Sequence, residues 1–250
     1  MVLINLEHIH FEYHGGRPVL KDCSFQLHEG ERVGLIGPNG SGKTTLFHII
    51  MGLLRPNSGK IEILGREMRG EKDFAGIRQK VGLLFQDADD QLFSPTVLED
   101  VAFGPLNQGK SINEAKDIAH QTLCSLGLDG FEDRITHRLS GGEKKLASLA
   151  TVLAMDPAVL LLDEPTNGLD TRTTERIINV LNKIGIAYIF ISHNAEFIEQ
   201  TADKVYGMAN GQIMLEETKI PHTHVHAHGY GQHPHVHSGE DRYVSEEDEN

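Results

Sequence analysis

The stretch that decides the fold reads Gly37-Pro38-Asn39-Gly40-Ser41-Gly42-Lys43-Thr44, followed by Thr45. It fits the pattern G-x-x-x-x-G-K-[ST], in which a glycine-rich turn directs backbone N–H groups at phosphate oxygens. The apolar run Arg32–Ile36 before the turn predicts a buried strand, and the pattern after it predicts a helix over about Lys43–Leu53. A strand, a turn and a helix N-terminus in this order predict a nucleotide site, in which Lys43 binds the β and γ phosphates and Thr44 binds Mg²⁺.

A second apolar run, Leu160–Leu162, ends in the two carboxylates Asp163 and Glu164. A strand that is apolar on both faces lies in the middle of a parallel sheet, so its end should lie beside the phosphate loop. We expect Asp163 to hold Mg²⁺, and Glu164 to orient or deprotonate the attacking water.

Short apolar runs alternate with longer helical patterns along the chain, which is typical of the α/β class. Tyr188–Ile191 predicts a strand that a helix over about Arg172–Ile184 joins to Leu160–Leu162, so these two strands should be parallel. Three shorter antiparallel strands are expected at Val2–Phe11, Ser24–Leu27 and Ile61–Leu64, a strand at Val81–Phe85, and helices near Asn113–Leu126 and Glu143–Ala154.

Composition excludes several classes of protein. The formal net charge of −13 argues against a general nucleic-acid binder, which needs a basic face. No apolar run reaches 18 residues, the N-terminus has no secretory pattern, and the two cysteines are isolated. Residues 216–250 carry eight acidic and two basic residues without apolar periodicity, so we expect a folded domain over 1–215 and a disordered acidic tail over 216–250.

Between the two phosphate-site motifs lies Leu139-Ser140-Gly141-Gly142-Glu143. The phosphate loop, this LSGGE segment, the LLLDE run, Gly168-Leu169-Asp170 and His193 resemble the nucleotide-binding subunits of ABC transporters in their order and spacing. The resemblance covers about residues 2–215. It implies a P-loop NTPase (RecA-like) α/β core with an antiparallel β subdomain and an α-helical signature subdomain over about residues 87–155.

Ser140 and the two glycines after it precede a helix predicted from Glu143, which would make a second anion-binding helix start. By the resemblance, the phosphate loop of one chain and the Ser140 segment of another enclose each ATP. The chain should therefore work as a homodimer or as a pair with another ABC subunit, and ATP should close the pair.

The resemblance also implies roles for single residues. The implied ATP-binding residues are those from Gly37 to Thr45 together with Tyr13, Gln86, Ser140, Gly141 and Gly142. Gln86 would sense Mg²⁺ and water, His193 would act in catalysis at the γ-phosphate, and Asp170 would pair across the dimer. Phe11 is an alternative to Tyr13 as the aromatic residue that stacks on adenine. In that case Tyr13 is a residue of the core. Two departures concern the closed dimer: Glu143 stands where many relatives carry glutamine, and Lys144-Lys145-Leu146 lacks the arginine common there.

The segment Phe85–Val97, followed by Asp100–Pro105, resembles the corresponding region of energy-coupling-factor importers, especially their cobalt and nickel members. In these proteins the segment binds a transmembrane coupling subunit, and substrate-specific membrane subunits complete the importer. Leu92, Phe93 and Val97 would supply the apolar contact, or else they pack the helical subdomain.

The tail carries seven of the chain's 15 histidines, namely His222, His224, His226, His228, His233, His235 and His237. Imidazole suits Ni²⁺ and Co²⁺, and histidines at every second position differ from a contiguous purification tag. We therefore expect an ATPase at the cytoplasmic face of the membrane that powers nickel or cobalt import and uses ATP and Mg²⁺. The alternatives are vitamin or other micronutrient uptake, a soluble non-transport ABC ATPase, and a tail without a metal role.

Overall fold

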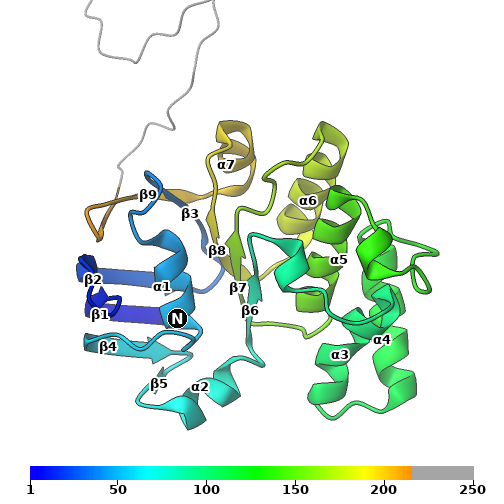
Figure 1. The fold of residues 1–250 in the computed structure, drawn as a ribbon, viewed down its shortest axis with the longest axis horizontal. Coiled ribbons are helices and arrows are strands. Elements are labelled where there is room, and N and C mark those ends of the chain that lie inside the picture. Colours follow the sequence, from blue (N-terminus) through cyan, green and yellow to red (C-terminus); the bar gives the residue numbers. More distant parts are fainter. Residues whose placement is uncertain (216–250) are drawn as a thin grey trace, which may run out of the picture.

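Two sheets of different kinds organise the chain in the computed structural model, which describes residues 1–215 (Figure 1). The smaller sheet is antiparallel and has the strand order β2-β1-β4-β5. Its strands are β1 (Val2–Glu12), β2 (Pro18–His28), β4 (Ser58–Ile63) and β5 (Arg66–Glu67). The three antiparallel strands expected at Val2–Phe11, Ser24–Leu27 and Ile61–Leu64 are thus confirmed as β1, β2 and β4, and β2 is longer than predicted.

The larger sheet has six strands in the order β10-β9-β3-β8-β7-β6. These are β3 (Arg32–Ile36), β6 (Val81–Leu84), β7 (Val159–Asp163), β8 (Ala187–Ile191), β9 (Lys204–Ala209) and β10 (Gln212–Leu215). All neighbours are parallel except the edge pair β9 and β10. The predicted parallel pairing of the DE strand with its successor is confirmed, since Leu160 lies opposite Tyr188. The carboxyl ends of β3, β7 and β8 therefore meet at one edge.

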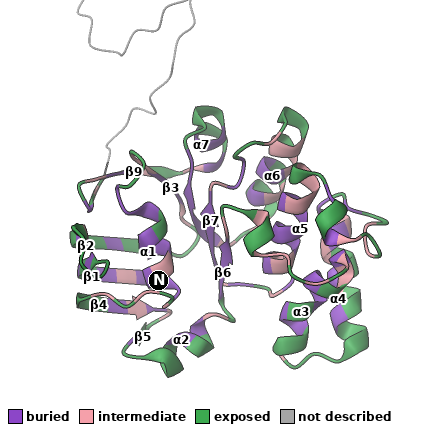
Figure 2. Cartoon of the chain, in the orientation of Figure 1, coloured by how far each residue is buried: buried purple, intermediate pink, exposed green. Residues whose placement is uncertain are grey.

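Alternate side chains of the central strands enter two different cores. On β7, Val159 and Leu161 face the core shared with the antiparallel sheet, whereas Leu160 and Leu162 face the helical side. Figure 2 shows β6 and β7 as buried strands in the middle of the molecule. Helix α1 (Lys43–Ile50) lies between the two sheets and is buried on most sides. The phosphate loop that leads into α1 is thus anchored to the most buried part of the chain.

The remaining helices cover the other face of the larger sheet or extend from it. They are α3 (Val97–Asn107), α4 (Ile112–Ser125), α5 (Gly141–Leu153), α6 (Thr171–Lys183) and α7 (Ala195–Thr201), and α2 (Glu71–Ile77) lies near β5. Helices α3, α4 and α5 pack on one another in the region predicted to be a helical subdomain. Each begins with a Ser or Thr cap, followed three residues later by a glutamate that completes a capping box.

Some predicted boundaries were wrong. Helix α5 begins at Gly141, not at Glu143, because Ser140 caps it and its first turn consists of the two glycines. Helix α1 ends at Ile50, because Gly52 takes the left-handed conformation (φ 66°) just after it. Over residues 1–215, every helix is too short or too polar to cross a membrane. The predicted tail, 216–250, lies outside the described residues.

Candidate nucleotide site

The phosphate loop needs glycine at two positions because other chain segments press against it. Gly37 has φ 146°, and a Cβ there would lie 2.1 Å from the carbonyl oxygen of Met208. Gly42 has φ 110°, and a Cβ there would lie 2.8 Å from a methyl carbon of Leu20. Both values of φ are open to glycine and strained for other residues. The loop is therefore held as a tight cradle by β2 and β9.

Lys43 and Ser41 place polar atoms inside this cradle. The Lys43 ammonium donates hydrogen bonds to the carbonyl oxygens of Gly37 (2.7 Å) and Pro38 (3.1 Å). Burial lowers the pKa of Lys43, although Glu164 and Asp163 oppose this shift. The buried Ser41 hydroxyl has no hydrogen-bond partner among the described residues. An orphaned buried hydroxyl next to an ammonium fits a bound phosphate, which would accept hydrogen bonds from both groups.

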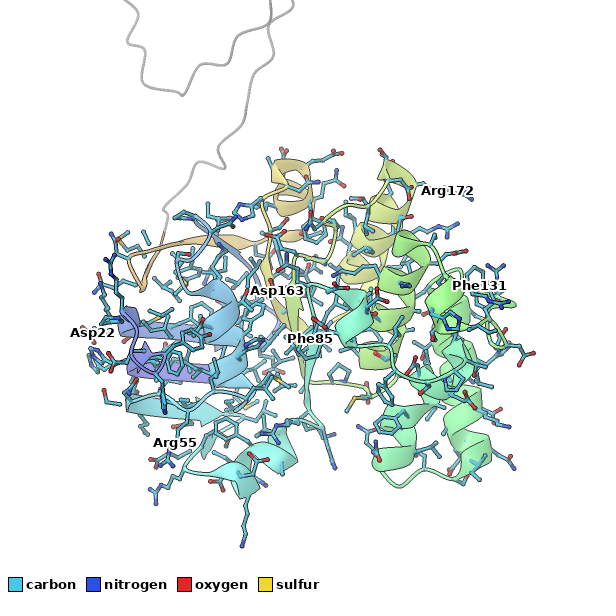
Figure 3. All side chains as sticks on the ribbon, viewed as in Figure 1. Asp22, Arg55, Phe85, Phe131, Asp163 and Arg172 are labelled. Atoms are coloured by element: carbon cyan, nitrogen blue, oxygen red, sulfur yellow. The ribbon has the colours of Figure 1, made fainter. Side chains whose placement is uncertain are left out.

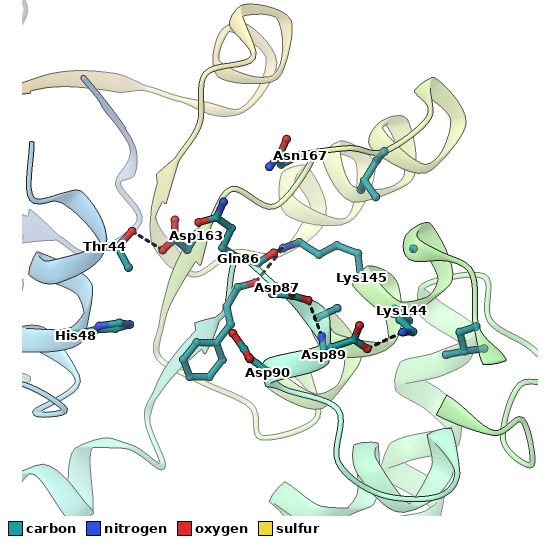
Figure 4. Close-up of a pocket in the computed structure, with 15 residues that line it drawn as sticks. Thr44, His48, Gln86, Asp87, Asp89, Asp90, Lys144, Lys145, Asp163 and Asn167 are labelled. Atoms are coloured by element: carbon teal, nitrogen blue, oxygen red, sulfur yellow. Dashed lines mark hydrogen bonds and ion pairs between the residues drawn. The ribbon is translucent and has the colours of Figure 1, made fainter. Parts of the chain in front are cut away.

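Thr44 and Asp163 bring two oxygen ligands together at the edge of the larger sheet. The Thr44 hydroxyl donates to a carboxylate oxygen of Asp163 across 2.8 Å (Figure 4). Asp163 is buried, and this desolvation raises its pKa, while Thr44, Lys145, His48 and Lys43 act in the opposite direction. Hard oxygen donors beside a phosphate cradle are what Mg²⁺ prefers. The donor set therefore fits the predicted magnesium ligands.

Glu164 follows Asp163 and is held in an unusual backbone conformation. Its φ is 45°, in the left-handed region, and its N–H donates to the carbonyl of Ile191 at 3.0 Å. Its carboxylate lies 3.4 Å from Nε2 of His193. Burial raises the pKa of Glu164, with a further rise from Asp163, and His193 opposes both. Backbone strain at a half-buried carboxylate beside a histidine is typical of a catalytic position.

The geometry separates the two candidates for the adenine-stacking aromatic. Phe11 is buried and packs edge-to-face against Tyr13, with ring centroids 4.9 Å apart. Tyr13 is 47% exposed, and its hydroxyl lies 3.2 Å from the Thr45 hydroxyl, which places it next to the phosphate loop. Of the two rings, only that of Tyr13 is open to a ligand.

The signature segment, Leu139–Glu143, offers an exposed helix start. The Ser140 hydroxyl accepts a hydrogen bond from the N–H of Glu143 (3.3 Å), and the Glu143 carboxylate accepts from the N–H of Ser140 (2.8 Å). Ser140 and Gly141 are exposed. A Cβ on Gly142 would lie 3.2 Å from the Thr173 hydroxyl, so glycine lets α5 approach the start of α6. Asp170 caps α6 by accepting from the N–H of Thr173 (3.0 Å).

A cleft of about 770 Å³ lies between the signature segment and the predicted magnesium ligands, and we call it the subdomain cleft. Its lining includes Gly141 and Gln86, and Figure 4 shows Thr44 and Asp163 on one side of it and Lys144 and Lys145 on the other. Figure 3 shows Asp163 and Phe85 in the middle of the molecule, between the antiparallel sheet and helices α3 to α5. Within one chain, the Ser140 segment therefore does not close over the phosphate loop. The sequence reasoning missed His48 and Lys145 at this cleft, because neither belongs to a motif of known chemistry.

The three residues of the predicted partner contact differ in their exposure. Val97 is completely buried, because it is the first residue of α3 and packs in the helical core, so its assignment to a partner surface was wrong. Leu92 is partly buried against the same core. Phe93 is 67% exposed and packs edge-to-face on the half-exposed Phe103, with centroids 4.8 Å apart. These two rings line a groove of about 340 Å³, the aromatic groove, which also includes Leu53 and Met155.

The seven tail histidines lie outside the described residues. Within residues 1–215, no group of three or more His, Cys, Asp or Glu side chains could hold a metal ion by itself. The exposed His8 pairs with a single carboxylate, that of Asp22, at 2.6 Å.

Comparison with known proteins places these features in context. Residues 20–167 match the ABC transporter family. The chain is 52% identical to a putative ABC transporter ATP-binding protein of Nitratidesulfovibrio vulgaris, over 88% of this chain and 81% of that protein. It is 44% identical to the energy-coupling factor transporter ATP-binding protein EcfA of Methanothermobacter thermautotrophicus, over 87% and 71%.

Solved structures agree with these matches. The structure of cbiO1 from Clostridium perfringens, part of the ABC transporter complex cbiONQ, aligns with a TM-score of 0.77 at 34% identity, over 86% of this chain and 87% of that one. The dimeric post-hydrolysis state of the ATP-binding cassette MJ0796, bound to ADP and Pi, aligns with a TM-score of 0.79 at 27% identity, over 86% and 97%.

Proposed function

The chain belongs to the ABC transporter family, and on this basis we propose that it is the ATP-hydrolysing subunit of an energy-coupling-factor importer for nickel or cobalt. Members of this family hydrolyse ATP in transport. The finer proposal concerns how each residue acts, which partners the chain meets and which substrate crosses the membrane.

In the proposed mechanism, the phosphate loop and Lys43 bind the triphosphate of ATP. Thr44 and Asp163, whose oxygens lie 2.8 Å apart, would hold Mg²⁺, and the ion would supply positive charge against the phosphates. Glu164 accepts the proton of the attacking water, and its raised pKa makes the carboxylate a stronger base than an exposed glutamate. His193, whose Nε2 lies 3.4 Å from that carboxylate, is proposed to orient it and to contact the γ-phosphate.

We further propose that two chains, or this chain and a related subunit, enclose each ATP. The exposed Ser140 and Gly141 of one chain then cap the nucleotide bound by the phosphate loop of its partner. Asp170, which caps α6 next to Gly142, is proposed to contact the partner chain.

The observation that carries the importer proposal is the aromatic groove. A 67% exposed phenylalanine, stacked on a second aromatic beside a groove, is typical of a protein interface. The groove also contains Phe85, which directly precedes Gln86. A membrane subunit bound there would be connected to the magnesium site through one short segment. On this proposal the chain is a peripheral subunit at the cytoplasmic face of the membrane.

The proposed substrate follows from the tail sequence, in which imidazoles recur at every second position. To test it, the chain is purified with its membrane partners, and uptake of Ni²⁺, Co²⁺ and a vitamin is measured in vesicles containing ATP. Uptake of either metal supports the proposal. Vitamin uptake alone would replace it by the micronutrient alternative, and the absence of any membrane partner would replace it by a non-transport ATPase.

A separate experiment addresses the tail. Calorimetry should detect Ni²⁺ binding by the full chain, and deletion of residues 221–250 should abolish it. Unchanged metal binding in the deleted chain would remove the tail from the proposal without affecting the ATPase.

A further inference from the structure

Lys145 is a buried lysine on α5 to which the mechanism above gives no role. Only 4% of its surface is exposed. Its ammonium donates hydrogen bonds to the main-chain carbonyl oxygens of Phe85 and Gln86, each across 2.9 Å. A buried ammonium is costly unless strong partners compensate, so these two contacts are a specific feature of the fold.

Gln91 reinforces the same junction. Its side-chain oxygen accepts a hydrogen bond from the N–H of Phe85 (3.1 Å), and its side-chain nitrogen donates to the carbonyl of Ser148 (2.9 Å) and to the hydroxyl of Thr151 (2.8 Å). Ser148 and Thr151 both belong to α5. The main chain of Phe85 and Gln86 is therefore tied to α5 by both its N–H and its C=O groups.

These bonds join the two sides of the subdomain cleft. Phe85 and Gln86 continue β6 of the larger sheet, whereas α5 begins at the Ser140 cap of the signature segment. Lys145 lies five residues after Ser140 on the same rigid helix. A movement that brings Ser140 toward a partner's nucleotide is therefore transmitted through Lys145 to the backbone of Gln86.

The charges around Lys145 point to the same site. Burial lowers the pKa of Lys145 to about 8, whereas Asp163 on β7, Asp87 after β6, and Glu164 raise it. Of these carboxylates, Asp163 and Glu164 are the two proposed to bind Mg²⁺ and water.

We propose that Lys145 is a positioning residue of the ATPase, which ties the Gln86 main chain to the signature helix so that the two move as one unit. The inference rests on the proposed role of Gln86 at the magnesium site. It assigns Lys145 no contact with ATP, so its effect should appear in kcat and not in nucleotide affinity.

The test compares Lys145→Met, Gln86→Ala and the double variant in the full chain, with kcat and KM for Mg-ATP measured at pH 7. We expect Lys145→Met to lower kcat about 100-fold, as for a small misplacement of a catalytic group, with little change in KM. Because Lys145 acts through Gln86, the double variant should be no slower than the slower single variant.

The matched control is Lys116→Met, which replaces an exposed lysine on the neighbouring helix α4, outside the subdomain cleft. It should leave kcat within about twofold, since an exposed surface charge contributes little. Lys145→Arg retains charge and donors, and its kcat should exceed that of Lys145→Met. Each variant's thermal midpoint is measured, so that misfolding is recognised.

The comparison of kcat with KM, together with the rescue by arginine, gives a readout that a merely structural lysine would not move. A lysine needed only for stability would lower the thermal midpoint of the methionine variant without a selective loss of kcat in the folded protein.

Three results would overturn the inference: a kcat for folded Lys145→Met within twofold of the parent, a double variant slowed by the product of the single effects, or an arginine variant no faster than the methionine variant. If Gln86→Ala is itself fully active, Gln86 does not have its proposed role. The inference that Lys145 acts through Gln86 then fails as well. If Gln86→Ala is slow while Lys145→Met is not, only the inference about Lys145 fails.

Discussion

The two sides of the subdomain cleft are built on different principles. On the sheet side, Ser41, Lys43 and Asp163 are buried. Asp163 accepts a hydrogen bond from the Thr44 hydroxyl at 2.8 Å, and the Ser41 hydroxyl has no partner within residues 1–215. On the helical side, Ser140 and Glu143 satisfy each other in a capping box, and the helix start is exposed. The sheet side therefore has polar groups that are available to a bound ligand. The helical side has its side-chain hydrogen bonds already satisfied and is exposed at the surface.

This difference explains why one chain carries two anion-binding elements that do not meet. The sheet side contains Asp163 and Glu164, two carboxylates whose pKa values are raised by burial. Such groups are suited to catalysis. The signature segment offers only backbone N–H groups, a hydroxyl and a helix dipole, which are suited to recognising an anion. Variants on the two sides should therefore fail in different ways.

The largest effect is expected on the sheet side. Glu164→Gln should lower kcat by about 10²–10⁴-fold, the usual contribution of a general base, while ATP still binds. Because burial raises the pKa of Glu164, removal of its charge should not lower the thermal midpoint. A steady-state ATPase assay with a nucleotide-binding measurement checks both points. Glu175→Gln, an exposed glutamate on α6, is the control. Parental turnover in Glu164→Gln would refute its assignment as the base.

On the helical side, Ser140→Ala can be compared with Ser111→Ala, since both serines cap a helix in the same way, at 3.3 Å from the N–H of the glutamate three residues later. Each change should cost about 1 kcal/mol of stability through the lost cap. Only Ser140→Ala should also lower ATPase activity, by about tenfold for a lost charge-assisted contact to the nucleotide. Equal activities in the two variants would mean that Ser140 is only a helix cap.

The decline of kcat at acidic pH should be displaced to higher pH. As pH falls, Glu164 becomes protonated and can no longer accept a proton from water, so kcat declines. Since burial raises its pKa, the decline should begin at a higher pH than for an exposed glutamate. In the same window the folded chain binds more protons than the unfolded chain, so acidification should raise stability there. A decline that begins only at the ordinary glutamate pKa would contradict the account.

The smallest effect is expected at the aromatic groove. Phe93→Ala should weaken recovery of the chain with its membrane partner, while the thermal midpoint changes little because the ring is largely exposed. Ile112→Ala removes a side chain of similar exposure (66%) outside the groove and serves as the control. Equal recovery of both variants would mean that the aromatic groove does not bind the membrane partner.

Much of the sheet side could be predicted from sequence, because its chemistry lies in contiguous motifs whose strands end at one edge. Lys43, Thr44, Asp163 and Glu164 all lie where the patterns indicated. The helical side was harder. The burial of Val97 and the bonds of Lys145 depend on how α3 and α5 pack against the sheet, which no local pattern reveals. The choice of Tyr13 over Phe11 likewise required the burial of each ring.

The most direct test of the shared site mixes two defective chains. Lys43→Ala removes the ammonium that binds the phosphates, and Ser140→Arg blocks the signature segment. Neither variant should therefore hydrolyse ATP alone. If each ATP is enclosed by both chains of a pair, a mixed pair retains one intact site, and the mixture should regain activity above the sum of its parts. Activity no greater than that sum, with mixed pairs shown to form, would mean that ATP is bound and hydrolysed within one chain.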